Sequence, residues 1–183
     1  MLDKFYNNYK NEIESFIDQA LAEDIGVGDH SSLSCIDSSK KNTAQLIIKD
    51  KGHIAGINLA KLIFRRYDSN LKFSPFLVDG DYVKEGDIGF TVRGNIQSIL
   101  STERVVLNSM QRMSGIASLT FNLNKMIQHT SCKLLDTRKT TPNFRYPEKW
   151  AVRIGGGTNH RMGLFDAIMI KDNHVDFCGS MTK

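Results

Sequence analysis

Five side chains that can carry positive charge fall in three short segments of the second half of the chain. Arg138 and Lys139 form a pair, His160 and Arg161 follow a run of three glycines, and Lys171 comes ten residues after Arg161. Guanidinium groups hold carboxylates and phosphates through paired hydrogen bonds, and ammonium groups act as compact charges toward the same anions. These residue types predict a binding site for a polyanion.

The charge balance of these segments supports the prediction. Like charges a few ångströms apart repel by about 4 kcal/mol per pair at an effective dielectric of 20. Asp136 and Asp172 are the only carboxylates close to the cations in sequence, so we expect a bound anion to supply the missing negative charge. Each segment alone has a simpler interpretation: an exposed Arg-Lys pair, a flexible glycine turn or a hydrogen-bonded structural histidine. The combination of all three favours the anion site.

Two apolar segments are expected to be the strands that position these cations. Residues 133–137 end just before Arg138, and residues 166–171 end in Lys171. Residues 144–154 between them have a helical pattern, with Pro147 in the first turn. A strand–helix–strand order with apolar strands predicts parallel βα units buried on both faces. Because the carboxyl ends of such strands meet at one edge, we expect the five cationic side chains to converge on one cleft.

The first part of the chain is expected to be an α+β module. Apolar spacing predicts, in order, a helix at 13–21, a strand at 43–49, a short strand at 52–56, a helix at 58–67, strands within 71–92 and a long helix from about 98. Gly80-Asp81 and Gly86-Asp87 suit tight turns, which need positive φ. We expect Ser114-Gly115 to break the long helix, and we place the domain boundary there.

Length and composition limit the possible classes of protein. The hydrophobic share is 40%, the charged share is 24% and the net charge is +4, which together indicate a globular chain. Lys and Arg are dispersed, which argues against nucleic-acid binding. The three cysteines lack a C-x-x-C spacing, so neither a disulfide framework nor a zinc site is predicted. The sequence shows no apolar segment of signal-peptide or membrane-spanning type, and we expect a cytoplasmic protein.

The combined motifs resemble those of the quinolinate phosphoribosyltransferases, also called nicotinate-nucleotide pyrophosphorylases. Four segments carry the resemblance in order and spacing: 136–142, 148–157, 159–164 and 170–174. Three earlier segments also fit: 23–29, 80–87 and 103–117. His30-Ser31 replaces a more usual pair of that family. The similarity covers nearly the whole chain.

The resemblance implies a fold and a reaction. The implied fold class is α/β, with an α+β substrate-capping domain over 1–115 and the first part of an α/β barrel over 116–183. A closed barrel has about 250 residues in its common form, so the chain is expected to stop before the fold is complete. The implied reaction joins quinolinate to 5-phosphoribosyl-1-pyrophosphate with Mg²⁺, in NAD biosynthesis. It yields nicotinate mononucleotide, pyrophosphate and CO₂.

The resemblance also implies roles for individual residues. The implied substrate-binding residues are Arg104, Arg138, Lys139, His160, Arg161 and Lys171, and the implied catalytic residues are Lys139 and Lys171. The three arginines would hold the carboxylates of quinolinate, and the two lysines would bind phosphates. Arg104 belongs to the domain that covers the neighbouring subunit's barrel in this family, which implies a homodimer with shared sites. The family's metal-binding carboxylates would lie beyond Lys183, so no metal ligand is expected in this chain.

Two alternatives remain open. One is a ModD-like, molybdenum-linked relative of the same fold, against which the segments 159–161 and 170–174 argue. The other is a biotinyl- or lipoyl-like carrier, suggested by Lys84 in a Val-Lys-Glu-Gly-Asp turn between predicted strands. Lys84 has no methionine beside it, as carrier lysines do. Binding of a vicinal dicarboxylate would distinguish these classes from the phosphoribosyltransferase.

Overall fold

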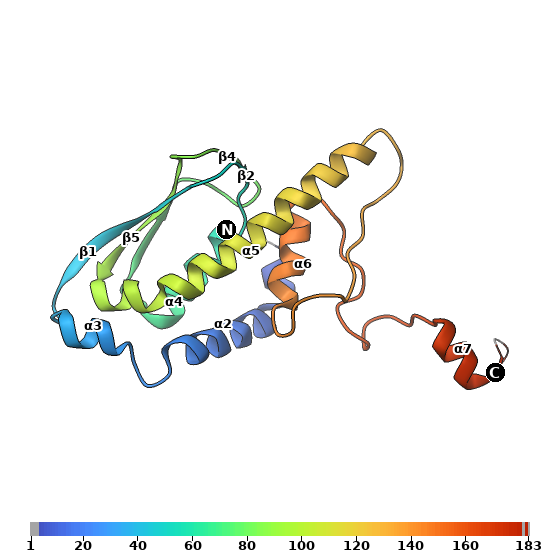
Figure 1. Cartoon of the computed structure of the whole chain (residues 1–183), viewed down its shortest axis with the longest axis horizontal. Coiled ribbons are helices and arrows are strands. Elements are labelled where there is room, and N and C mark those ends of the chain that lie inside the picture. The colour runs from blue at the N-terminus through green and yellow to red at the C-terminus, as the bar shows by residue number, and fades with distance from the viewer. Residues whose placement is uncertain (1–3, 181, 183) are drawn as a thin grey trace.

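The computed structural model describes residues 4–180 and 182 of the chain. Its elements are, in chain order, α1 (Lys4–Asn8), α2 (Lys10–Ile25), α3 (His30–Cys35), β1 (Lys41–Ile47), β2 (Gly52–His53), α4 (Ile57–Tyr67), β3 (Lys72–Pro75), β4 (Tyr82–Val83), β5 (Ile88–Asn95), α5 (Ile96–Ile127), α6 (Arg145–Ile154) and α7 (Asp172–Cys178). In Figure 1 the strands and α4 lie along the first half of the long helix α5, and α6 lies beside its middle. The architecture is a mixture of helix and sheet, as predicted.

An antiparallel sheet forms one layer of the first part of the chain. Its strand order is β1-β5-β3, and β2 pairs with β4 in a second, two-stranded sheet. In the central strand β5, Phe90 and Val92 face the core and are almost fully buried. Gly80 and Gly86 adopt φ values of 98° and 89° in the turns on either side of β4. These turns confirm the prediction made from the two Gly-Asp corners.

The core lies between this sheet and helices α2, α4 and α5. Ile63 of α4 and Met113 of α5 are fully buried at its centre. Helix α4 begins where predicted because Asp79 caps it: the carboxylate accepts hydrogen bonds from the backbone N–H groups of Gly56, Ile57 and Asn58 at 2.6, 2.8 and 3.2 Å. The cap thereby ties the turn before β4 to the start of α4.

Helix α5 runs unbroken through Ser114 and Gly115, so the predicted break is wrong. The Ser114 hydroxyl accepts a hydrogen bond from the Ala55 N–H at 2.9 Å, and Ser118 does the same for His53 at 2.8 Å. These serines bond to the neighbouring β2 segment and do not compete with the helix backbone. Glycine costs a helix about 1 kcal/mol relative to alanine, and Met113, two residues before Gly115, is fully buried in this part of α5. The domain boundary placed near 115 stays a prediction.

The strands predicted at 133–137 and 166–171 are not formed as such. The first is reduced to a single parallel bridge between Leu135 and Thr158, and the second forms no ladder. A strand exists only where a neighbour accepts its backbone hydrogen bonds, and the described residues offer one such neighbour to Leu135 and none to 166–171. Helix α6 is confirmed, with Pro147 in its first turn.

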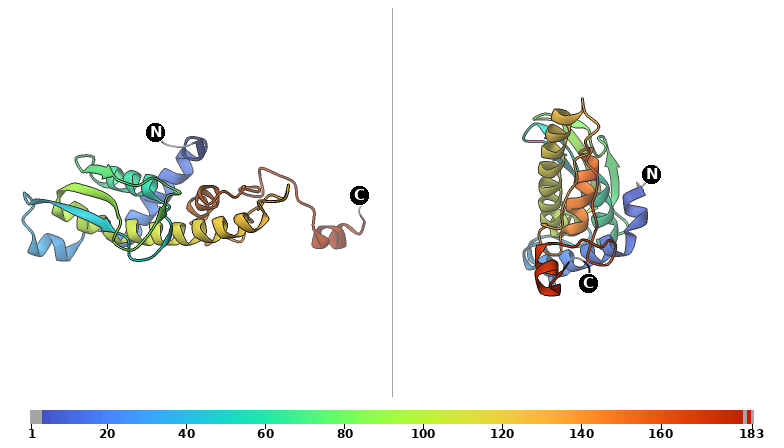
Figure 2. Two further views of the ribbon diagram at one scale, coloured as in Figure 1. Left: turned by 90° about the horizontal axis from the view of Figure 1, so that it is seen from above. Right: turned by 90° about the vertical axis from the view of Figure 1, so that its right-hand side faces the viewer.

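The last described segment extends away from the body. Residues 163–171 and α7 project from the end where α6 begins, as two views show (Figures 1 and 2). Phe165, Ile168 and Phe177 on this segment are more than four-fifths exposed. Within residues 4–180 and 182, no helix has the length and apolar character required to cross a membrane.

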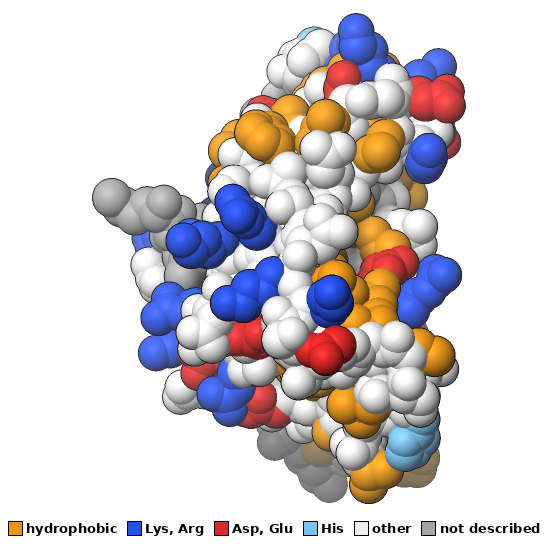
Figure 3. All heavy atoms as spheres, turned by 90° about the vertical axis from the view of Figure 1, so that its left-hand side faces the viewer, with side chains coloured by type: hydrophobic (Ala, Val, Ile, Leu, Met, Phe, Trp, Pro, Cys, Tyr) orange, Lys and Arg blue, Asp and Glu red, His pale blue; other side chains and the backbone are white. Residues whose placement is uncertain are grey.

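Charged side chains are mixed on the surface at the β1 and α3 end of the molecule. Figure 3 shows Lys and Arg side chains interspersed with Asp and Glu on this face, with hydrophobic groups in separate patches. Such mixing is typical of a solvated surface and agrees with the dispersed basic residues in the sequence.

Candidate anion-binding site

The parallel bridge between Leu135 and Thr158 aligns two of the predicted cationic segments. The Thr158 N–H donates to the Leu134 carbonyl at 2.8 Å, and the Asp136 N–H donates to the Thr158 carbonyl at 3.2 Å. Arg138 comes three residues after Leu135, and Arg161 comes three residues after Thr158. Parallel segments in this register leave the bridge at the same edge. The structure thus brings the Arg138 and Arg161 segments to one edge, although the second strand is not the predicted one.

A buried ion pair fixes this alignment. The Lys149 ammonium donates to Asp136 Oδ1 at 2.5 Å, and the two side chains are 1% and 8% exposed. Asp136 also accepts from Asn159 Nδ2 at 2.6 Å and from the His160 N–H at 2.8 Å. Lys149 donates in addition to the His160 carbonyl at 3.2 Å. Helix α6 is therefore bonded to both segments at the point where they leave the bridge.

A second contact holds the far end of the loop that follows Asp136. Glu148, next to Lys149 on α6, accepts from Arg112 Nε and Nη2 at 3.0 and 2.9 Å. The same carboxylate accepts from the Thr141 hydroxyl at 2.8 Å and from the Thr141 N–H at 3.2 Å. Residues 137–140 are thus presented between two anchors on one helix. This loop carries Arg138 and Lys139.

Arg138 contains an unsatisfied donor. Its Nε is the one buried side-chain nitrogen or oxygen found without a hydrogen-bond partner within residues 4–180 and 182. A buried donor without an acceptor costs about 1–3 kcal/mol, so the arrangement suits an anion that would accept from it. The neighbouring Lys139 is exposed, and its N–H is bonded to the Thr137 hydroxyl at 3.0 Å. The loop thus carries one cation with a buried, unpartnered donor and one that is exposed.

His160 and Arg161 line a cavity of about 520 Å³ together with Arg153 and Asp166. Arg161 Nη1 donates to the Ala167 carbonyl at 3.0 Å. Asp166 accepts from the N–H groups of residues 162 and 163 at 2.6 and 2.9 Å, and these bonds hold its carboxyl pKa below the usual range. Asp166 thereby fixes the turn directly after Arg161.

The remaining predicted residues lie elsewhere. Lys171 is exposed at the N-cap of α7, on the projecting segment, where its N–H donates to His174 Nδ1 at 3.0 Å. Arg104 is exposed on α5, two helical turns before Arg112. The cavity beside Arg161 includes neither Arg138 nor Lys171. The structure thus brings together the ends of the Arg138 and Arg161 segments, and it leaves Lys171 and Arg104 apart from them.

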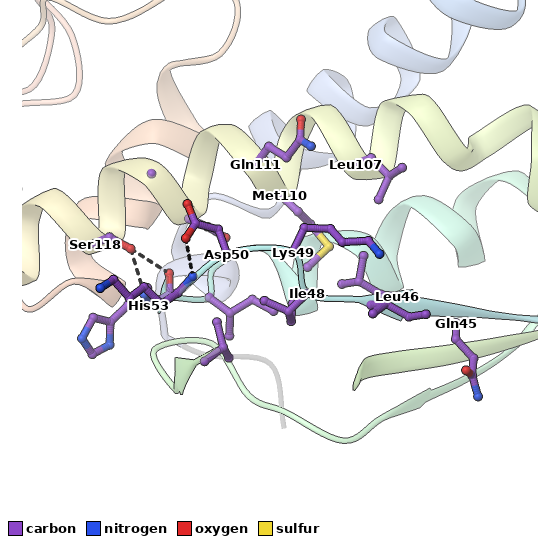
Figure 4. Close-up of a pocket in the computed structure, with 17 residues that line it drawn as sticks. Gln45, Leu46, Ile48, Lys49, Asp50, His53, Leu107, Met110, Gln111 and Ser118 are labelled. Atoms are coloured by element: carbon purple, nitrogen blue, oxygen red, sulfur yellow. Dashed lines mark hydrogen bonds between the residues drawn. The ribbon is translucent and has the colours of Figure 1, made fainter. Parts of the chain in front are cut away.

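A larger cavity, of about 750 Å³, lies between the β1–β2 segment and α5 (Figure 4). Leu46, Ile48 and Met110 contribute to its mainly apolar lining, and none of the predicted site residues reaches it. In the described part of the chain, no group of three or more His, Cys, Asp or Glu residues is placed so that it could hold a metal ion.

The roles of Glu148, Lys149 and Arg112 were not predicted from the sequence. All three belong to segments that carried the resemblance, but no position-specific pattern marked them as anchors. The one available signal is that two adjacent opposite charges, Glu148 and Lys149, directly precede Trp150, a large apolar residue that is usually buried. Thr158 was missed as a bridge partner because the preceding glycines predict a turn.

Taken together, these features define a class of protein: a mixed helix-and-sheet fold in which a long helix leads to α6 and a parallel bridge, with cationic residues following both sides of that bridge. Within that class, the chain belongs to the quinolinate phosphoribosyltransferase family. Residues 29–114 match the family's N-terminal domain, and residues 116–183 match its C-terminal domain.

Individual relatives agree with this assignment. The chain is 48% identical over 172 residues to a chloroplastic nicotinate-nucleotide pyrophosphorylase (carboxylating) of Oryza sativa, covering 93% of this chain and 46% of that protein. It is 42% identical over 170 residues to a probable enzyme of the same name from Bacillus subtilis, covering 93% and 58%. The chain thus spans about half the length of these curated relatives.

Solved structures show the same fold. NadC from Streptococcus pyogenes superposes with a TM-score of 0.85 at 40% identity, covering 93% of this chain and 61% of that one. The nicotinate-nucleotide pyrophosphorylase of Francisella tularensis superposes with a TM-score of 0.86 at 37% identity, covering 100% and 65%.

Proposed function

We propose that the protein to which this chain belongs is a quinolinate phosphoribosyltransferase. It transfers the phosphoribosyl group of 5-phosphoribosyl-1-pyrophosphate to quinolinate and releases pyrophosphate and CO₂, leaving nicotinate mononucleotide. The observation that carries this proposal is the Leu135–Thr158 bridge, which brings the segments of Arg138 and Arg161 together, and beside which Arg138 keeps a buried donor without an acceptor. The names of the relatives support the same reaction.

The chemistry needs positioned charge and no nucleophilic side chain. Guanidinium groups such as those of Arg138 and Arg161 bind carboxylates in pairs of hydrogen bonds, which suits the two carboxylates of quinolinate. As pyrophosphate leaves, the ribose gains oxocarbenium character and the pyridine nitrogen attacks its C1 carbon. The ring nitrogen becomes cationic and stabilises the carbanion that forms when CO₂ departs, and a proton from water then completes the ring carbon. Lys139 and Lys171 serve the phosphates, so catalysis rests on orientation and electrostatics.

Three further features belong to this proposal. Arg104 acts at the site of a second subunit in a homodimer, in keeping with its exposed position away from Arg138. Mg²⁺ accompanies the pyrophosphate donor, and the described residues form no cluster of three or more His, Cys, Asp or Glu that could hold it by themselves. The protein acts in the cytoplasm.

The direct test is a reaction of the full-length protein with both substrates, followed by chromatography of the products. Nicotinate mononucleotide and pyrophosphate are expected in equal amounts, with one CO₂ per product released from labelled quinolinate. Nicotinate offered in place of quinolinate serves as the control, because it lacks one of the two carboxylates. Absence of product with quinolinate, in a protein that is folded and supplied with Mg²⁺, would overturn the proposal.

A further inference from the structure

The contacts of the Asp136–Lys149 pair are concentrated on the segments that present the anion-binding residues. Asp136 accepts from Lys149, from Asn159 Nδ2 and from the His160 N–H, and Lys149 also donates to the His160 carbonyl. Asp136 precedes Arg138 by two residues, and His160 directly precedes Arg161. The pair therefore bonds to both cationic segments immediately before their arginines.

The ionic character of the pair calls for an explanation beyond packing. Both side chains are almost fully removed from water, at 1% and 8% exposed. The free energy needed to remove two charges from water cancels much of the electrostatic attraction between them. Apolar residues of similar volume often hold a buried position equally well. An apolar pair would not orient the two segments, because it makes no hydrogen bonds to the residues on either side of the Leu135–Thr158 bridge. The bridge itself is a single residue pair and constrains the register weakly.

We propose that Lys149, through Asp136, is a positioning residue that holds Arg138 and Arg161 in the relative placement needed to grip one dicarboxylate. Lys149 does not touch the substrate: its charge is matched by Asp136, and its ammonium is enclosed. This inference rests on the proposed function, since it assigns the pair a role in binding quinolinate.

The test separates positioning from stability by removing both charges together. The variant is Asp136→Asn with Lys149→Met in the full-length protein, which avoids an uncompensated buried charge and keeps an oxygen able to accept from the His160 N–H. The control is Asp18→Asn with Arg66→Met, which removes an ion pair between α2 and α4 far from the strand edge. Thermal unfolding and the kinetic constants for each substrate are measured for both variants and the wild type.

A positioning role predicts a KM for quinolinate raised about tenfold or more, because small displacements of binding groups are costly, while the Tm stays close to the wild-type value. The Lys149→Met single variant is expected to lose both stability and affinity, and adding Asp136→Asn is expected to restore only the stability. The control variant keeps the wild-type KM.

A double variant with wild-type Tm and wild-type kinetic constants would overturn the positioning role while leaving the proposed function intact. A double variant whose stability and affinity fall together, with affinity regained when a stabilising osmolyte restores the Tm, would also overturn it. A folded wild-type protein that neither binds nor consumes quinolinate would instead remove the proposed function, and the inference with it.

Discussion

Glu148 offers a quantitative test of how the loop at 137–140 is held. Replacing it with alanine removes two hydrogen bonds with Thr141, each contributing about 1 kcal/mol, and the paired bonds with Arg112. The Arg112 side chain is 58% exposed, so solvent screening limits its ion pair to about 1 kcal/mol. Glu148→Ala should therefore lower the free energy of unfolding by about 3 kcal/mol, within the range expected for a broken buried network.

Urea unfolding followed by circular dichroism measures this loss, and two matched variants divide it. Thr141→Val removes both hydrogen bonds of the hydroxyl, the one that it donates to Glu148 and the exposed one that it accepts from Arg112 Nη2 at 3.2 Å, and should cost about 1–2 kcal/mol. Arg112→Met combined with Glu148→Gln gives a double-mutant cycle in which the Arg112–Glu148 coupling should be about 1 kcal/mol. A Glu148→Ala loss below about 0.5 kcal/mol, the level of an ordinary surface substitution, would refute the anchoring role.

Four further outcomes are expected. Burial raises the carboxyl pKa of Asp79, so the folded protein holds a proton on this group more tightly than the unfolded chain does. The stability that this protonation contributes is present at low pH and is lost as the pH rises through the raised pKa. Thermal melts of the wild type and of Asp79→Ala from pH 3 to 8 should therefore differ in how steeply their Tm depends on pH. The hydrogen bond from Arg66 lowers the carboxyl pKa of Asp18, so the stability that Asp18 contributes should be lost as the pH falls below the usual range of aspartate. Because both side chains are about half exposed, Asp18→Asn should lower the free energy of unfolding by less than about 1 kcal/mol in urea titrations at pH 7. A larger loss would contradict the exposed geometry of the pair. Arg138→Lys keeps the charge but loses paired hydrogen bonding, and the KM for quinolinate in the full-length protein should rise about tenfold or more; an unchanged KM would exclude Arg138 from carboxylate binding. The 183-residue chain alone should form no nicotinate mononucleotide detectable by chromatography, because it spans about half the length of its curated relatives; any turnover would contradict this.

The longer helices were predictable because their apolar spacing is a local property of the sequence, whereas the short helices α1, α3 and α7 were not predicted. The patterns over 58–67 and 144–154 match α4 and α6 within one residue at each end. The predicted break at Ser114-Gly115 failed for a non-local reason: the Ser114 hydroxyl is engaged by Ala55, almost sixty residues earlier. Local preference for a turn was overridden by packing against the β2 segment.

The strands and the anchors were less predictable because both depend on partners distant in sequence. Residues 166–171 have an apolar pattern, yet a strand needs a neighbour, and the bridge to Leu135 came instead from Thr158 after the glycines. The cationic residues could be named from their types and order. The buried partners that hold them, Glu148 and Lys149, could not, since charged residues in a helix are usually exposed.

The two adjacent anchors on α6 also limit how the sequence can vary in length. Consecutive helical residues are separated by 1.5 Å of rise and about 100° of rotation, so Glu148 and Lys149 define two fixed attachment points. The chain between Asp136 and Thr141 must span those points and no more. An inserted or deleted residue there would release one end and carry Arg138 and Lys139 out of place, whereas the exposed turn at 128–133 has no such attachment to α6. We therefore expect length variation among homologous chains to accumulate in that turn and to be absent between the anchors.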